Sequence, residues 1–164
     1  MTDAAVADSG LYERDFYAWT QDQAAALRRL AESRPNAGLD WDNVVEEIES
    51  LGSEQEHALW SHLRLILVHC LKLAQEPDQR PHRHWQAEIA AQRGQLENRL
   101  RKNPSLKPRL NALLADAYGA ARKEVEVLFD LRRGNLPDAC PFTLEQVRDP
   151  DWFPSSPERK SDHD

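Results

Sequence analysis

The fold is decided by the stretch SEQEHALWSHLRLILVHCLKLAQ, residues 53–75. It is the most hydrophobic part of the chain, and its apolar residues cover more than one face of a helix: Leu59, Leu63, Ile66, Leu67, Cys70, Leu71 and Ala74. A helix that is apolar on several sides must be covered by neighbours on several sides. We therefore predict that this segment is the central helix of a helical domain.

Helical patterns also precede the central segment. One helix is expected over about 11–33, with Asp8 or Ser9 as its N-cap, and another starts after Asp40, which can cap its first turn. Its apolar stripe is Val44, Ile48 and Leu51. Gly52 either bends a continuous helix or lets a new one start with Ser53 and Glu56 as a capping box. We favour one bent helix.

Beyond the proline-bounded loop at 76–81, two more helices are predicted, from Trp85 to about Asn103 and from Pro104 to about 133, with Asn103 as the N-cap between them. No segment has the alternation of a strand. The sequence therefore predicts an all-α fold, an up-and-down bundle of four to five helices with an extended aromatic C-terminal tail. Residues 1–154 form this single domain, and residues 155–164 are expected to be disordered.

Composition excludes several classes of protein. No apolar run is long enough to span a membrane, and the acidic N-terminus has no signal core, so we expect a cytoplasmic protein. Two distant cysteines, Cys70 and Cys140, suit a reducing compartment. The formal net charge of −7 makes nucleic-acid binding unlikely. A basic stripe between Arg93 and Arg109 leaves weak nucleic-acid binding as a third hypothesis.

Carboxylates and histidines offer one chemical hypothesis, a metal-binding bundle or metalloenzyme. Its candidate ligands are Glu46, Glu47, Glu49, His62 and His69. These would converge if the segments on either side of Gly52 folded against each other or if chains associated, and a divalent transition metal would then be the cofactor. The alternative is a solvated first helical turn and packing histidines, with no cofactor, which we favour.

Two smaller histidine motifs are weaker candidates. Glu54 and His57 form one ExxH, whereas a di-metal bundle needs two such pairs. His82, His84 and Glu88 follow a proline-bounded loop and are expected to face solvent. The sequence has no GxSxG, HExxH or glycine-rich phosphate loop. We identify no catalytic residues.

Aromatic residues offer the other hypothesis, an interaction surface. In YERDFYAW, Tyr12, Phe16 and Trp19 share one helical face, with Arg14 and Asp15 outward. The candidate surface residues are Tyr12, Phe16, Tyr17, Trp19, Trp152 and Phe153. For the rings of YERDFYAW we favour the alternative, in which they anchor the helix to the core, and the tail aromatics are expected to fill a groove. Tyrosine and tryptophan are also enriched in interface hot spots.

Eight blocks of sequence resemble the bacterial domain of unknown function 29 family. They are YERDFYAWT (12–20), LDWDNVVEEIESLG (39–52), HCLK (69–72), WQAEIAAQR (85–93), NPSL (103–106), AYGAAR (117–122), LPDACPFT (136–143) and DPDWFP (149–154). The resemblance implies an all-helical bundle from a bacterium and no known activity. The HRH at 82–84 departs from the family pattern. Because every notable residue has a structural explanation and no catalytic set assembles, we predict a noncatalytic interaction or regulatory module that binds an unknown protein partner or itself.

Overall fold

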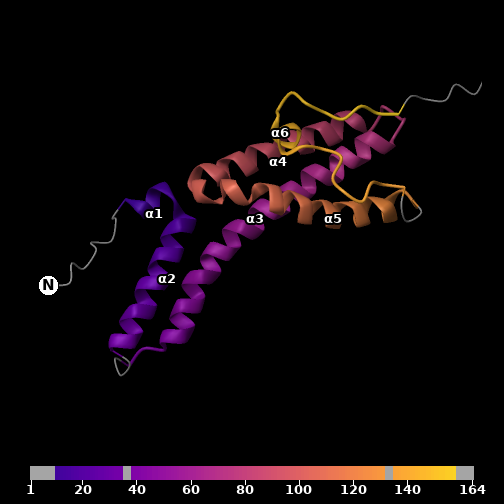
Figure 1. The fold of residues 1–164 in the computed structure, drawn as a ribbon. Coiled ribbons are helices and arrows are strands. Elements are labelled where there is room, and N and C mark those ends of the chain that lie inside the picture. Colours follow the sequence, from indigo (N-terminus) through magenta and orange to yellow (C-terminus); the bar gives the residue numbers. More distant parts are fainter. Residues whose placement is uncertain (1–9, 35–37, 132–134, 158–164) are drawn as a thin grey trace, which may run out of the picture. The chain divides into compact units, whose positions relative to one another are not determined.

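The computed structural model describes residues 10–34, 38–131 and 135–157. Every regular element in these residues is helical (Figure 1), which confirms the all-α prediction. The elements are α1 (Leu11–Arg14), α2 (Phe16–Ser33), α3 (Trp41–Gln75), α4 (His82–Lys102), the 3-10 helix η1 (Pro104–Arg109), α5 (Leu110–Leu128) and α6 (Leu144–Arg148). None of the helices in this part of the chain is long and apolar enough to cross a membrane.

Contacts divide the chain into two compact units. Unit 1 comprises Met1–His57 with Arg99–Lys107, and unit 2 comprises Ala58–Asn98 with Pro108–Asp164. Unit 1 therefore holds α1, α2 and the first half of α3. Unit 2 holds the second half of α3, most of α4, and α5 and α6.

The predicted first helix is interrupted at Asp15. Its backbone is extended there (φ −155°, ψ 89°), and its carboxylate accepts the amide of Ala18 at 3.0 Å, which caps α2. The prediction that Asp15 points outward is wrong, because only 8% of the residue is exposed. A cap must turn its side chain back toward the free amides of the first turn. The predicted caps Asp8 and Ser9 lie outside the described residues.

Helix α3 runs through Gly52 without a break. Its start after Asp40 is as predicted, with the Asp40 carboxylate accepting the amide of Asn43 at 3.4 Å. The reason for Gly52 is the closeness of α2 rather than a turn. A Cβ at Gly52 would lie 2.4 Å from Oγ1 of Thr20, a residue that is completely buried. Glycine therefore allows α3 to approach α2 closely at this point.

The predicted apolar stripe at the start of α3 is wrong by one residue. Val45 is 7% exposed, whereas Val44 and Leu51 are 37% and 38% exposed. One residue is a rotation of about 100° around a helix. Because Gly52 contacts α2, the position seven residues before it, Val45, faces α2 as well.

Unit 2 contains the largest buried apolar cluster of the described residues. On α3, Leu59, Leu63, Ile66, Leu67, Cys70 and Leu71 are at most 1% exposed, as the sequence predicts for a central helix. Helix α4 adds Ile89 and Leu96, and α5 adds Ala117, Tyr118, Ala121 and Val125. Polar pairs join the helices at the edge of this core: His62 with Gln92 at 2.8 Å, and Arg64 with Glu124. The second half of α3, α4 and α5 thus form a helical bundle.

The C-terminal segment is fixed to α4 by the buried side chain of Arg93. Its guanidinium donates to the carbonyls of Val147 (2.8 Å), Gln146 (3.2 Å) and Trp152 (2.9 Å). The same guanidinium lies 5.2 Å from the centre of the Phe153 ring. Burial lowers the pKa of Arg93. Three carbonyl acceptors offset part of the loss of water around this cation, while its buried Nη1 has no hydrogen-bond partner among the described residues.

Candidate functional site

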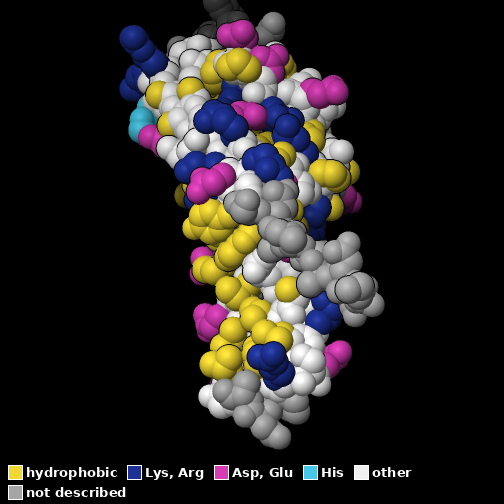
Figure 2. Space-filling view, turned by 90° about the vertical axis from the view of Figure 1, so that its left-hand side faces the viewer, with side chains coloured by type: hydrophobic (Ala, Val, Ile, Leu, Met, Phe, Trp, Pro, Cys, Tyr) yellow, Lys and Arg dark blue, Asp and Glu magenta, His cyan; other side chains and the backbone are white. Residues whose placement is uncertain are grey.

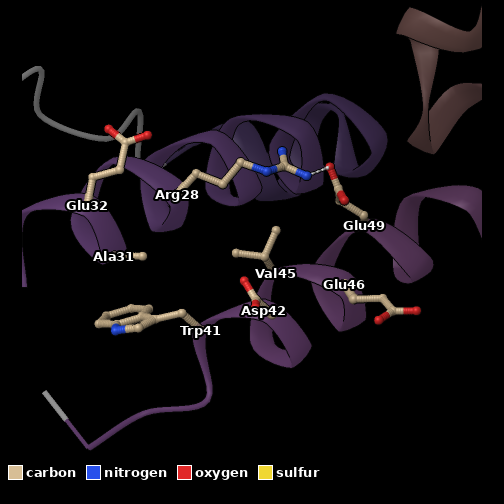
Figure 3. Close-up of a pocket in the computed structure, with 8 residues that line it drawn as sticks. All are labelled: Arg28, Ala31, Glu32, Trp41, Asp42, Val45, Glu46 and Glu49. Carbon is tan, nitrogen blue, oxygen red and sulfur yellow. Dashed lines mark hydrogen bonds and ion pairs between the residues drawn. The ribbon is translucent and has the colours of Figure 1, made fainter. Parts of the chain in front are cut away.

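A groove of about 380 Å³ lies between α2 and the start of α3 in unit 1 (Figure 3). Its lining residues are Arg28, Ala31, Glu32, Trp41, Asp42, Val45, Glu46 and Glu49. These residues line the groove together because residues three or four positions apart lie on the same face of a helix. The α2 residues follow that spacing, and so do those of α3, whose start after the Asp40 cap sets the place of Trp41.

The base of the groove is apolar. Ala31 and Val45 project into the space between the two helices, and the indole ring of Trp41 lies at one end of it (Figure 3). Nε1 of Trp41 is buried and has no hydrogen-bond partner in the described part of the chain. The indole therefore contributes an aromatic surface to the groove, while its donor is buried.

The rim of the groove is acidic. It carries four carboxylates and one guanidinium, a formal charge of −3. Arg28 pairs with Glu49 at 2.6 Å, and both side chains are substantially exposed (53% and 37%). Glu32, Asp42 and Glu46 are exposed, and no basic side chain within residues 10–34, 38–131 and 135–157 pairs with them. The groove thus combines an apolar base with unneutralised carboxylates.

The metal-ligand candidates are divided between the two units. Glu46, Glu47 and Glu49 belong to unit 1, whereas His62 and His69 belong to unit 2. The arrangement in which the segments around Gly52 fold against each other is absent, because α3 is continuous. Among the residues that the structure describes, no group of three or more histidine, cysteine, aspartate or glutamate side chains could hold a metal ion.

The contacts and burial of the candidate histidines show how each is placed in the fold. Nδ1 of His62 bonds Oε1 of Gln92, and Nδ1 of His69 is buried without a partner among the described residues. Burial, followed by the charge of Lys72, lowers the pKa of His69. The prediction that His82 faces solvent is wrong: it is 8% exposed, and its Nε2 lies 2.9 Å from the carbonyl of Glu76, since it closes the loop before α4. His84 is exposed as predicted.

The predicted aromatic surface falls into two parts. Tyr12, Phe16 and Trp19 in unit 1 form one cluster, with ring centres 4.9–5.6 Å apart, and half of Tyr12 is exposed. Tyr17 is partly buried, and its amide donates to Oδ1 of Asn103 at 3.0 Å. In unit 2, Trp152 packs edge-on against Phe142, and Phe153 contacts Arg93. The tail aromatics thus serve packing within unit 2.

Sequence reasoning missed a polar network in unit 1. Asp15 accepts the amide and the hydroxyl of Ser105, both at 2.8 Å, while Asn103 accepts the amide of Tyr17. The Asn103 side chain therefore caps α2. Asn103 also directly precedes η1, as predicted, and its carbonyl accepts the amide of Leu106 at 3.1 Å. The sequence signal for this network is the pair of tripeptides DFY (15–17) and NPS (103–105), since aspartate and asparagine at helix starts are typical capping residues. Their mutual pairing spans about 90 residues and is invisible locally.

The basic stripe also changes once burial is known. Arg93 is only 3% exposed and bonds carbonyls, so it is unavailable to phosphate. Arg99 donates to Oε1 of Gln55 at 2.8 Å. The predicted stripe therefore loses its first member.

Exposed large hydrophobic side chains concentrate in unit 1. Within the described residues, those of unit 1 are Tyr12 (50%), Leu30 (42%), Leu39 (55%), Val44 (37%) and Leu51 (38%), and those of unit 2 are Val127 and Leu128. Figure 2 shows hydrophobic side chains gathered on the face along which α2 runs, in the lower half of the view. Single exposed hydrophobic residues are ordinary, whereas a contiguous apolar patch is typical of an interaction surface.

Comparisons with known proteins agree with the fold. The crystal structure of an alpha-helical protein of unknown function from Rhodospirillum rubrum matches with a TM-score of 0.67 and 25% sequence identity, over 86% of this chain and 90% of that one. No curated protein matches the chain. The family described as "Domain of unknown function DUF29" matches residues 11–153, nearly the full length. The chain therefore belongs to this DUF29 family.

Proposed function

We propose that this protein is a noncatalytic interaction module of the bacterial cytoplasm that binds a protein partner through unit 1. One observation carries the proposal: unit 1 leaves large apolar side chains of both α2 and α3 in water, Leu30 and Val44 among them. Burying such residues against a partner is favourable by roughly 25 cal/mol per Å² of apolar surface. The same unit carries the groove.

The polar residues that attract attention in the sequence support the same proposal. Asp15 and Asn103 hold α2 to the NPSL segment, and Arg93 holds the C-terminal segment. Each of these buried side chains makes hydrogen bonds to backbone or side-chain atoms, although Nη1 of Arg93 has no partner in the described part of the chain. These polar residues are therefore explained by their roles in the fold. The exposed helical surfaces of unit 1 have no such structural role, and we propose that they bind the partner.

A photo-crosslinking residue at position 30 tests the proposal in the bacterium that encodes the protein. Leu30 lies on α2 in unit 1, and Ala112, exposed on α5 in unit 2, is the matched control position. We expect one discrete adduct from position 30 and none from position 112. The purified partner should then bind the wild-type protein, with roughly tenfold weaker binding to Leu30→Glu. Identical adduct patterns at both positions would refute the proposal.

A further inference from the structure

We propose that the groove between α2 and α3 binds an arginine side chain of a basic segment in the partner protein. This inference rests on the proposed interaction function and names the chemistry of the partner. The charge of the region is its first support. Residues 41–57 contain six aspartate or glutamate residues and no lysine or arginine. A surface of one sign attracts partners of the opposite sign and orients them during encounter.

The geometry of the groove fits a planar cation. Asp42 and Glu46 are one helical turn apart on the same face of α3, and the Trp41 ring lies at the end of the groove where α3 begins, closer to Asp42 than to Glu46 (Figure 3). A guanidinium can donate to carboxylates through its N–H groups while its face lies against an aromatic ring. The apolar base formed by Ala31 and Val45 suits the methylene stem of arginine.

The charges already present direct the incoming cation to one part of the groove. Arg28 pairs with Glu49, so that carboxylate is already compensated. Asp42, Glu46 and Glu32 keep unpaired charge in the described part of the chain. An arginine from the partner would thus repeat at the Trp41 end the pairing that Arg28 makes with Glu49.

Other occupants fit the groove less well. A nucleic acid would bring phosphates against unpaired carboxylates, which is repulsive. A neutral apolar ligand would desolvate these carboxylates without pairing them, which is costly. The unpaired acids are therefore the feature that selects a cationic side chain.

The test uses the full chain labelled with fluorotryptophan and a short alanine-based helical peptide that carries arginines on one face. The Trp41 fluorine resonance is identified by its absence in Trp41→Phe. We expect the arginine peptide to shift this resonance. An otherwise identical peptide with citrulline, which has the same shape as arginine but no charge, should leave it unchanged.

Substitutions then locate the binding. The double variant Asp42→Asn/Glu46→Gln should weaken peptide binding roughly tenfold, because two exposed charge pairs are lost. The control is Glu47→Gln, which removes one negative charge, as Asp42→Asn or Glu46→Gln alone does, from an exposed neighbour that does not line the groove. It should change binding by less than about twofold. Circular dichroism during urea unfolding checks that the variants are folded.

Three results would overturn the inference: equal binding of the citrulline peptide, equal weakening by Glu47→Gln, or an unmoved Trp41 resonance. These results are distinguishable from failure of the proposed function. If the position-30 adduct forms but the arginine peptide does not bind in the groove, the proposed interaction function is supported and the arginine site is refuted. If neither position 30 nor the groove engages a partner, both proposals fail.

Discussion

Replacing Gly52 by alanine is expected to destabilise unit 1, although alanine is the better helix former. The new Cβ would lie 2.4 Å from Oγ1 of Thr20 and 3.1 Å from Nε2 of Gln21. The Gln21 amide can move aside because its side chain is exposed and flexible. Thr20 cannot do so freely, since it is completely buried and its hydroxyl donates to the Tyr17 carbonyl at 2.7 Å. Either the hydrogen bond breaks or α2 and α3 separate.

The magnitude follows from two opposing contributions. Overpacking a buried contact costs about 1–3 kcal/mol. Replacing glycine by alanine inside a helix stabilises by about 0.5–1 kcal/mol. Gly119, in the middle of α5, isolates the second contribution, because a Cβ there meets no atom within 4 Å. The two alanine variants should therefore differ in the free energy of unfolding by about 1–3 kcal/mol, with Gly119→Ala the more stable.

Urea unfolding followed by circular dichroism measures this difference. Thr20→Ala removes the hydroxyl that a Cβ at Gly52 would strike, so Gly52→Ala should cost less in the Thr20→Ala background than in the wild type. A double-mutant cycle gives this coupling energy directly. If Gly52→Ala stabilises the protein as much as Gly119→Ala does, the explanation of Gly52 by close helix approach is refuted.

Three further predictions concern buried polar groups. Asp15→Ala should lower the free energy of unfolding by about 2–3 kcal/mol, because the α2 cap and both bonds from Ser105 are lost, whereas Ser105→Ala should cost only about 1 kcal/mol in the same urea assay; equal losses would contradict the capping role. Arg93→Met should cost roughly 3 kcal/mol and speed amide hydrogen exchange around Val147, since three carbonyls lose their donor; unchanged exchange there would show that Arg93 does not hold the segment. Burial raises the pKa of Cys70 from 9.0 to about 12, so its thiol stays protonated in the folded protein while the unfolded chain ionises. The contribution of the buried neutral thiol to the free energy of unfolding is therefore complete below pH 9. It is lost at about 1.4 kcal/mol per pH unit as the pH rises toward 12. In Cys70→Ala, the free energy of unfolding should not show this decrease between pH 9 and 12.

The helices and their approximate ends could be predicted from the sequence because they depend on neighbours in the chain. Apolar spacing indicated α2 to α5, Asp40 indicated the start of α3, and the prolines around 76–81 indicated the loop before α4. The burial of residues 59–71 followed from apolar side chains on several helical faces. The acidic character of the start of α3 could also be predicted from the sequence, but the groove that these acidic residues line could not.

An all-α chain with a buried central helix and an acidic segment at 41–57 could be predicted from the residues alone, since periodicity, capping and composition are local properties. Which side of each helix is buried depends on tertiary packing. Val45 rather than Val44 is buried because Gly52 lies against Thr20. Asp15 turns inward because its carboxylate accepts hydrogen bonds from Ser105, which is 90 residues away in the sequence. Such pairings depend on packing between distant segments, which no local spacing encodes. The groove has the same origin: its lining comes from two helices, and only their packing brings Arg28 to Glu49 and leaves Asp42 and Glu46 unpaired in the described part of the chain.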